Sequence, residues 1–179
     1  MLLHIAHEAI IALVEGRGVS FPVPSPHLAE PRGIFTTIYS AHKLRGCVGF
    51  PVPTLPLFKA VAETARSAAS EDPRFVRVSL QEARSLRISI SILSPLSSVT
   101  PSEVEIGRHG LVISQGMRRG LLLPQVPVEH GWDRNTFLEQ TCVKAGLPPD
   151  AWQRGARIEA FTAEVFGDSD FEADVHFNK

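Results

Sequence analysis

The sequence predicts an α+β domain in which an antiparallel or mixed β-sheet is flanked by helices. Segments rich in β-branched and aromatic residues form two probable hairpins, at residues 33–50 and 109–123, and helix-like segments stand between and after them. The chain has 179 residues, which is the length of one ordinary domain with a real core. Residues 1–179 are therefore expected to form a single domain.

The N-terminal part of the chain predicts one helix and one extended segment. Residues 1–14 carry apolar side chains at helical spacing, and Gly16 is placed to end this helix. Its expected buried stripe consists of Leu3, Ala6, Ile10, Leu13 and Val14. Residues 19–31 hold four prolines, which favours an extended surface segment over a helix.

The first hairpin is expected to have strands at residues 33–39 and 44–50 around a short polar turn. A helix over residues 55–70 follows, with Thr54 as its N-cap. Its apolar stripe is Leu57, Val61, Ala65 and Ala68. Residues 79–85 predict a short helix capped by Ser79, and residues 86–93 alternate between apolar and polar side chains as a half-buried strand does.

The second half of the chain predicts another hairpin, a capped helix and a last strand. Residues 94–107 are rich in turn-forming residues and are not assigned, whereas residues 109–114 and 120–123 form the two arms of the hairpin. Asp133 is a good N-cap for a helix through residue 145, with Gly146 at its end. A strand is expected at residues 157–166, and a loosely held tail from Gly167 onward.

The composition excludes several classes of protein. A net charge of −1 provides no basic field of the kind that attracts nucleic acid or anionic membranes. Two cysteines form no disulfide framework and favour a reducing compartment. The first 14 residues lack the basic lead of a signal peptide and the length of a membrane span. These features together predict a cytoplasmic protein.

Motifs for cofactors and metals are missing from the sequence. There is no GxxxxGK[ST], no strand-borne GxGxxG, no CxxC, no HExxH and no GxSxG. His4 and His7 lie one helical turn apart and could share a metal ion, but no third ligand is visible nearby. Neither a cofactor nor a metal is therefore predicted.

The stretch at residues 44–50, Leu-Arg-Gly-Cys-Val-Gly-Phe, combines a nucleophilic sulfur with a positive charge. In a regular strand Arg45 and Cys47 share one face, with their Cβ atoms roughly 7 Å apart. A guanidinium at that distance favours the thiolate, which is the reactive form. Gly46 and Gly49 leave the backbone bare for a ligand or another chain segment. The alternative interpretation is a small buried cysteine in a sheet, with glycine marking a bulge.

Several blocks in fixed order resemble the AMMECR domain family, whose prokaryotic members are often labelled AmmeMemoRadiSam system protein A. Residues 44–49 are similar to the family's LRGCIG signature, with Val48 where isoleucine is common, and residues 72–75 match its DPRF block. The other matching blocks are residues 109–111, 119–126, 131–133, 137–138 and 142–147. The resemblance runs from about residue 33 to residue 166.

The resemblance implies an α+β domain with a main antiparallel-rich lobe and a smaller second lobe, and a signature near the groove between them. It assigns no reaction. The prokaryotic label implies a shared modification pathway with a Memo-like protein and a radical S-adenosylmethionine enzyme as partners.

The first functional hypothesis is a thiol-dependent enzyme that acts through Cys47 in an inter-lobe cleft. Arg45 would activate the thiol and hold an anion, and His109 would carry the proton because its unperturbed pKa lies near working pH. His109 could instead be a turn histidine that bonds a backbone carbonyl. The candidate binding residues are Gly46, Gly49, Asp72, Arg74, Gln125 and Glu129.

Two of these candidates also have structural interpretations, and the second cysteine is interpreted as structural. Asp72 could cap the turn before Pro73 and pair locally with Arg74. Gln125 could donate to an oxyanion or close a turn after Pro124, and the turn is favoured. Cys142 is predicted to point into the core of its helix and to be structural.

The second hypothesis is a non-catalytic binding or adaptor module, in which the Arg-Gly-Cys-x-Gly segment shapes a groove for a small-molecule or protein ligand. Nucleic acid ranks below these ligands, because it could use only a local patch such as Arg108, Arg118 and Arg119. A metal site at Cys47 and His109 is weaker still, since only two ligands are named. Whether the protein is an enzyme is left open by the sequence.

Overall fold

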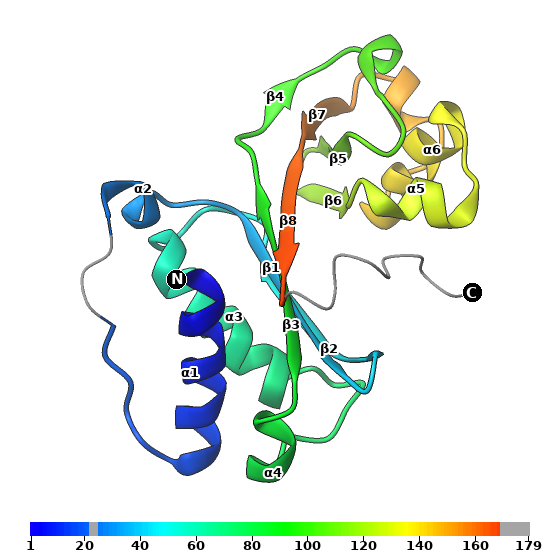
Figure 1. Ribbon diagram of the computed structural model, residues 1–179. Coiled ribbons are helices and arrows are strands. Elements are labelled where there is room, and N and C mark those ends of the chain that lie inside the picture. The colour runs from blue at the N-terminus through cyan, green and yellow to red at the C-terminus, as the bar shows by residue number, and fades with distance from the viewer. Residues whose placement is uncertain (22–24, 169–179) are drawn as a thin grey trace. The chain divides into compact units, whose positions relative to one another are not determined.

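The chain divides into two compact units in a computed structural model that describes residues 1–21 and 25–168 (Figure 1). Unit 1 consists of residues 1–93 together with the chain from Glu164 onward, and unit 2 consists of Ser94–Ala163. Each unit has helices and an antiparallel-rich sheet of its own. The predicted α+β class is therefore confirmed.

The sheet of unit 1 has the strand order β2-β1-β3-β8, so β2 lies at an edge. Its strands are β1 (Ile34–Ser40), β2 (Lys43–Phe50), β3 (Arg87–Leu93) and β8 (Ala163–Gly167). β1 pairs antiparallel with both β2 and β3, which confirms the predicted hairpin and the predicted strand after it. Ala41 and His42 form the tight turn with φ angles of 47° and 63°, which suits the twist of a two-residue hairpin.

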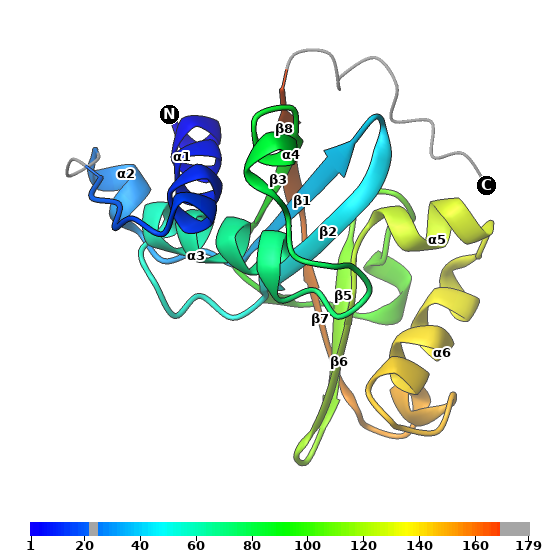
Figure 2. The same cartoon turned by 90° about the horizontal axis from the view of Figure 1, so that it is seen from below.

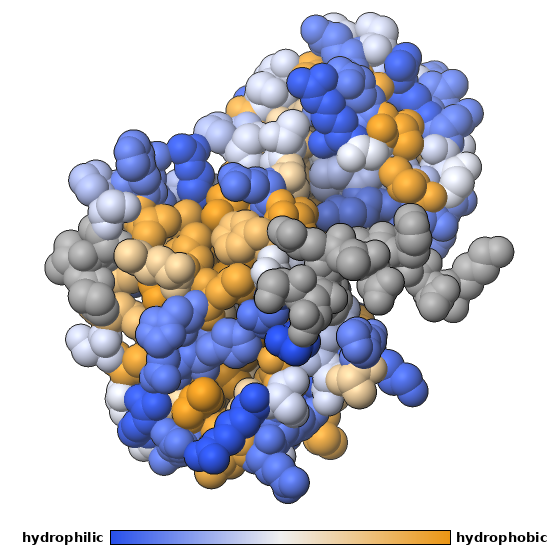
Figure 3. All heavy atoms as spheres, in the orientation of Figure 1, coloured by the Kyte–Doolittle hydropathy of each residue, from blue (hydrophilic) through white to orange (hydrophobic). Residues whose placement is uncertain are grey.

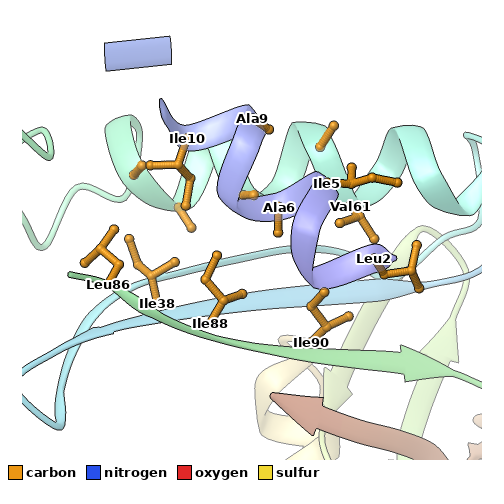
Figure 4. Close-up of a cluster of buried hydrophobic side chains, with 14 of the residues drawn as sticks. Leu2, Ile5, Ala6, Ala9, Ile10, Ile38, Val61, Leu86, Ile88 and Ile90 are labelled. Atoms are coloured by element: carbon orange, nitrogen blue, oxygen red, sulfur yellow. The ribbon is translucent and has the colours of Figure 1, made fainter. Parts of the chain in front are cut away.

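Helices α1 (Leu2–Glu15) and α3 (Leu57–Ser70) pack on one face of this sheet and enclose the core of unit 1 (Figures 2 and 4). All four residues of the predicted α3 stripe are buried. A buried hydrogen bond of 2.7 Å between the hydroxyls of Thr36 and Thr64 also links β1 to α3. The face of the sheet that carries Thr37 and Cys47 is the opposite one, because side chains alternate along a strand.

The buried face of α1 differs from the predicted one. Ala6 and Ile10 are buried as expected, but the other buried residues are Leu2, Ile5, Ala9 and Ala12. Three residues of the predicted stripe, Leu3, Leu13 and Val14, only pack at the edge of the core. The helix lies against both the sheet and α3, so small alanines fill a close contact that a search for large apolar residues overlooks.

The proline-rich segment contains a short helix, which the sequence did not predict. Helix α2 (Pro26–Ala29) begins at a proline, and proline is tolerated at the first helical position because no partner for its nitrogen is needed there. Pro22 and Pro24 lie outside the described residues. α3 begins after Pro56 rather than after Thr54, so the predicted N-cap is wrong by two residues. Helix α4 (Leu80–Ala83) is capped by Ser79 as predicted.

Unit 2 has a sheet of order β4-β7-β5-β6, against which helix α6 packs. The strands are β4 (Ser97–Ser98), β5 (Gly110–Gln115), β6 (Arg118–Leu122) and β7 (Arg157–Phe161). The helices are α5 (Gln125–His130) and α6 (Arg134–Lys144), with 3-10 turns η1 (Pro101–Glu103) and η2 (Ala151–Gln153). The predicted second hairpin and the Asp133-capped helix are both confirmed.

Two expectations for the second half are wrong. Residues 157–166 form two strands, because the strand is interrupted at Thr162 and the chain continues in the other sheet as β8. Helix α5 begins at Gln125, which was expected to close a turn after Pro124. Of the predicted loose tail, residues 169–179 lie outside the described part, whereas Asp168 is anchored by Ile88 N at 2.8 Å and by His7.

In the part of the chain that the structure covers, no helix combines the length and apolarity needed to cross a bilayer.

Candidate functional site

A β-bulge at Arg45 interrupts the regular alternation of β2. Ile38 pairs with Gly46 and Tyr39 pairs with Leu44, so Arg45 has no partner residue in β1. A bulge inserts one extra residue and re-aims the side chains around it. The predicted common face of Arg45 and Cys47 assumed a strand without such an insertion.

The Arg45 guanidinium is held by helix α4 and not by the thiol. Its Nε donates to Glu82 Oε1 at 2.6 Å and its Nη2 donates to Glu82 Oε2 at 3.2 Å. The guanidinium carbon also lies 5.8 Å from the ring centre of Phe75. Only 13% of the side chain is exposed, and Nη1 is buried without a hydrogen-bond partner among the described residues. The charge of Arg45 is therefore paired within the fold.

Cys47 is a free, half-buried thiol on the edge strand. Thr37 lies directly opposite it in β1 and donates from Oγ1 to Cys47 Sγ at 3.3 Å. The backbone N–H of Cys47 donates to Asp72 Oδ2 at 2.9 Å. An outward-pointing N–H of an edge strand is thus occupied by a side chain of the fold.

Asp72 joins Cys47 to Arg74. Its carboxylate is buried and accepts bonds from Arg74 N at 3.1 Å, Arg74 Nε at 2.9 Å and Arg74 Nη2 at 2.7 Å. The Arg74 bonds, helped by the Cys47 N–H, hold the pKa of Asp72 far below its usual range despite the burial. The same pair, with a smaller contribution from Cys47, raises the pKa of Arg74. The predicted local pair is present, and it also carries a long-range bond to the strand.

At the two glycines near Cys47, other parts of the protein occupy the space that a side chain would take. A Cβ on Gly46 would lie 2.1 Å from the backbone oxygen of Ala68 in α3, and a Cβ on Gly49 would lie 2.2 Å from the ring of Phe35. Both glycines therefore admit a neighbouring chain segment, which is one of the two uses that the sequence suggested for them.

The remaining candidate residues belong to unit 2. His109 Nδ1 accepts the Glu105 N–H at 3.1 Å, so its neutral ring carries the proton on Nε2. Gln125 begins α5, with its Oε1 buried and unpaired among the described residues, and Glu129 is exposed on the same helix. Cys142 is fully buried in the core, and this burial raises the pKa of its thiol, as expected of a structural cysteine.

The structure thus brings Cys47, Asp72 and Arg74 together in unit 1 and directs Arg45 to Glu82. Thr37 was missed because a two-residue turn alone would pair it with Gly46, and only the bulge at Arg45 moves it opposite Cys47. No local sequence pattern around Glu82 indicates that it pairs with Arg45, which lies 37 residues away in the chain. Within residues 1–21 and 25–168, no three His, Cys, Asp or Glu side chains are grouped to hold a metal ion.

Unit 1 also has an open apolar hollow that the sequence did not predict. Figure 3 shows hydrophobic surface gathered beside α2 and the start of α1. The hollow is lined by Met1, Leu2, Leu28, Arg32, Leu57, Ile92, Glu164 and Phe166. These lining residues include no cysteine, serine or histidine.

Comparisons with known proteins agree on one family. The AMMECR1 family model matches residues 3–166. Protein MK0488 of Methanopyrus kandleri is 44% identical over 186 aligned residues, which cover 97% of this chain and 90% of that protein. Protein MJ0810 of Methanocaldococcus jannaschii is 48% identical over 147 residues, covering 76% of this chain and 73% of that protein. The crystal structure of uncharacterized protein PH0010 from Pyrococcus horikoshii superimposes with a TM-score of 0.80 at 41% identity, covering 94% of this chain and 90% of the other.

Proposed function

The chain belongs to the AMMECR1 family, and from this premise we propose that it is a thiol-dependent enzyme, or the thiol-bearing component of a modification pathway, acting through Cys47. One observation carries the proposal. A free, half-buried thiol lies beside a guanidinium that a buried carboxylate holds in place.

The surroundings of Cys47 supply a hydrogen-bond donor to the sulfur and a guanidinium on a neighbouring loop. The Thr37 hydroxyl donates to Sγ, and a donor stabilises negative charge on the atom that accepts its bond. Arg74 adds a fixed positive charge on the other side of Asp72. The reactive form of a cysteine is the thiolate, and a thiolate whose proton has gone to solvent needs no imidazole in contact with it.

The reaction proposed for Cys47 is nucleophilic attack on an electrophilic carbon. The thiolate supplies both electrons of the new S–C bond, and the leaving group departs with the pair of the bond that breaks. Solvent supplies the proton that the leaving group takes up, so this scheme assigns no step to His109. No oxidant or reductant enters.

The test is the rate at which iodoacetamide alkylates Cys47 at about neutral pH, followed by intact mass. A free cysteine is only a few per cent thiolate there, and part of the gain from fuller ionisation is lost to lower nucleophilicity. We therefore expect a rate roughly tenfold above that of N-acetylcysteine. The Thr37→Val variant should slow alkylation about threefold, and Thr37→Ser should restore it. Alkylation of wild-type Cys47 at the rate of the free thiol would refute the proposal.

A binding module is the second candidate, and the pairing of Arg45 with Glu82 favours it. The Arg45 guanidinium makes two hydrogen bonds to Glu82 and is mostly buried, so it shapes the surface beside the strand. The partners proposed from the resemblance are a Memo-like protein and a radical S-adenosylmethionine enzyme. In calorimetric titrations with either protein, a module predicts that Cys47→Ser binds as wild type does, while Arg45→Ala loses affinity.

A further inference from the structure

We infer that the Cys47 site takes substrates with an anionic oxygen group, a carboxylate or a phosphate, which Arg74 binds next to the sulfur. This inference rests on the proposed function, because it names the class of electrophile that the thiol would meet. The Arg74 guanidinium is fixed by Asp72, has unused N–H donors, and lies near Cys47.

Arg74 is held in a fixed orientation. Two of its side-chain nitrogens and its backbone N–H bond one carboxylate, that of Asp72, whose side chain is only 3% exposed. A bidentate guanidinium–carboxylate pair fixes both the plane and the direction of the guanidinium. The Phe75 ring, 5.3 Å from the guanidinium carbon, lies against the same group. A ligand therefore meets an arginine that has already lost much of its side-chain freedom.

The outer edge of this guanidinium remains open. The bonds to Asp72 use Nε and one N–H of Nη2, so three of the five N–H donors of an arginine are left, two of them on Nη1. Within the described residues, no group accepts a bond from Nη1, and 55% of the side chain is exposed. Nη1 and Nη2 together present the planar pair of donors that a carboxylate or a phosphate accepts.

The guanidinium with this open edge lies close to the backbone of Cys47. Asp72 Oδ2 accepts from both Cys47 N and Arg74 Nη2, so these nitrogens are separated by no more than the two hydrogen bonds laid end to end. An anion on Arg74 is therefore within a few bond lengths of the residue that carries Sγ. Arg45 offers nothing similar, since its two bonds to Glu82 and its low exposure remove it from a ligand.

The hydrogen bonding of Cys47 also favours a substrate that carries its own charge. The Cys47 N–H is committed to Asp72 and is not free to stabilise an oxyanion that develops during attack. Arg74, on the other side of Asp72, still has N–H donors to offer. A substrate that already holds a carboxylate or a phosphate uses them for binding and is positioned for attack at the neighbouring carbon.

The experiment compares two reagents that differ in charge. Iodoacetate and iodoacetamide both place a CH₂ carbon on sulfur and release iodide with the electron pair of the C–I bond. For each reagent, the second-order rate constant for Cys47 is divided by that for N-acetylcysteine. The anion preference is this quotient for iodoacetate divided by the quotient for iodoacetamide, so the intrinsic reactivity of the thiol cancels. We expect a preference of about tenfold for iodoacetate in the wild-type chain, from charge-assisted binding at a partly exposed site.

Variants and a competitor test the assignment to Arg74. Arg74→Gln should abolish the preference, and Arg74→Lys should keep only part of it, because lysine retains the charge without the planar pair of donors. Arg77→Gln is the matched control, an exposed arginine of the same loop that should leave the preference unchanged. Inorganic phosphate should slow the alkylation of Cys47 by iodoacetate but not by iodoacetamide. This competition is measured on the wild-type protein, so its result does not depend on whether a variant folds. Stronger inhibition by phosphate than by acetate would identify phosphate as the better anion.

The outcomes separate the inference from the proposed function. Fast alkylation by iodoacetamide without an anion preference, or a preference that survives Arg74→Gln, overturns the inference and leaves the thiol enzyme standing. A preference that depends on Arg74 supports the inference, even where the absolute rate equals that of a free thiol and the proposed enzyme fails.

Discussion

Replacing Asp72 with alanine is the substitution that tests the site most directly. The carboxylate accepts one bond from Cys47 N and three from Arg74. Losing it leaves the part-buried Cys47 N–H without its partner, which costs about 1–3 kcal/mol. The bonds from Arg74 add less than a buried ion pair does, since that side chain is more than half exposed. We expect Asp72→Ala to lower the free energy of unfolding by about 3 kcal/mol in total.

Two matched variants separate the hydrogen bond from the charge. Asp72→Asn retains an oxygen for the Cys47 N–H but loses the charge that faces Arg74, and should cost about 1 kcal/mol. Asp150→Ala removes the carboxylate of an exposed pair with Arg154, and should cost between about 0 and 1 kcal/mol. The three values are measured by urea unfolding at about neutral pH, followed by far-UV circular dichroism.

The pH dependence provides a second measurement on the same variants. The pKa of Asp72 is lowered in the folded state, so its ionised form stabilises the fold above the unfolded pKa, which is about 4. This contribution is lost as the pH falls from about 5 through the lowered pKa of the folded protein. The stability gap between wild type and Asp72→Asn should therefore be full at neutral pH and smaller at about pH 3. The reasoning fails if the gap does not change with pH, or if Asp72→Ala is as stable as Asp150→Ala.

Two further predictions concern the strand and the second cysteine. Gly46→Ala should destabilise the protein by about 2 kcal/mol or more, because its Cβ would meet a backbone oxygen of α3 at 2.1 Å. Gly18→Ala, where nothing lies within 4 Å of the added carbon, should melt as wild type does, and equal calorimetric midpoints for the two variants would contradict the packing argument. Iodoacetamide should label Cys47 but not Cys142 in the native protein, because burial both shields the Cys142 thiol and raises its pKa. Peptide mass spectrometry with and without urea checks this, and native labelling of Cys142 at a rate similar to Cys47 would disprove it.

The parts of the fold that were predicted correctly are those where two local signals coincide. In α6 the Asp133 cap and Gly146 bracket the helix, and in β3 strict alternation defines the strand. Where the signal depended on packing, the prediction failed. The buried face of α1 consists largely of small alanines. The break at Thr162 divides one predicted strand between two sheets. Neither choice is encoded in the local sequence pattern.

The residues of the site were identified more completely than their contacts. Cys47, Asp72 and Arg74 were all singled out, but the bond between Cys47 and Asp72 joins positions 25 residues apart. Hydrophobic periodicity cannot indicate a polar contact of that kind, because it reports which face of an element is buried and nothing about partners.

The choice between the two arginines shows how one backbone feature can redirect the chemistry of a site. In a regular strand the residue two positions before a cysteine shares its face, so Arg45 was the reasonable activator. The bulge places an extra residue at that position, and Glu82 and Phe75 hold the displaced guanidinium. The positive charge linked to Cys47 then comes from a loop that follows α3, through a carboxylate that also bonds the strand. Because that carboxylate holds both Cys47 and Arg74, a change at Asp72 should alter thiol reactivity and anion preference together, whereas a change at Glu82 should alter neither.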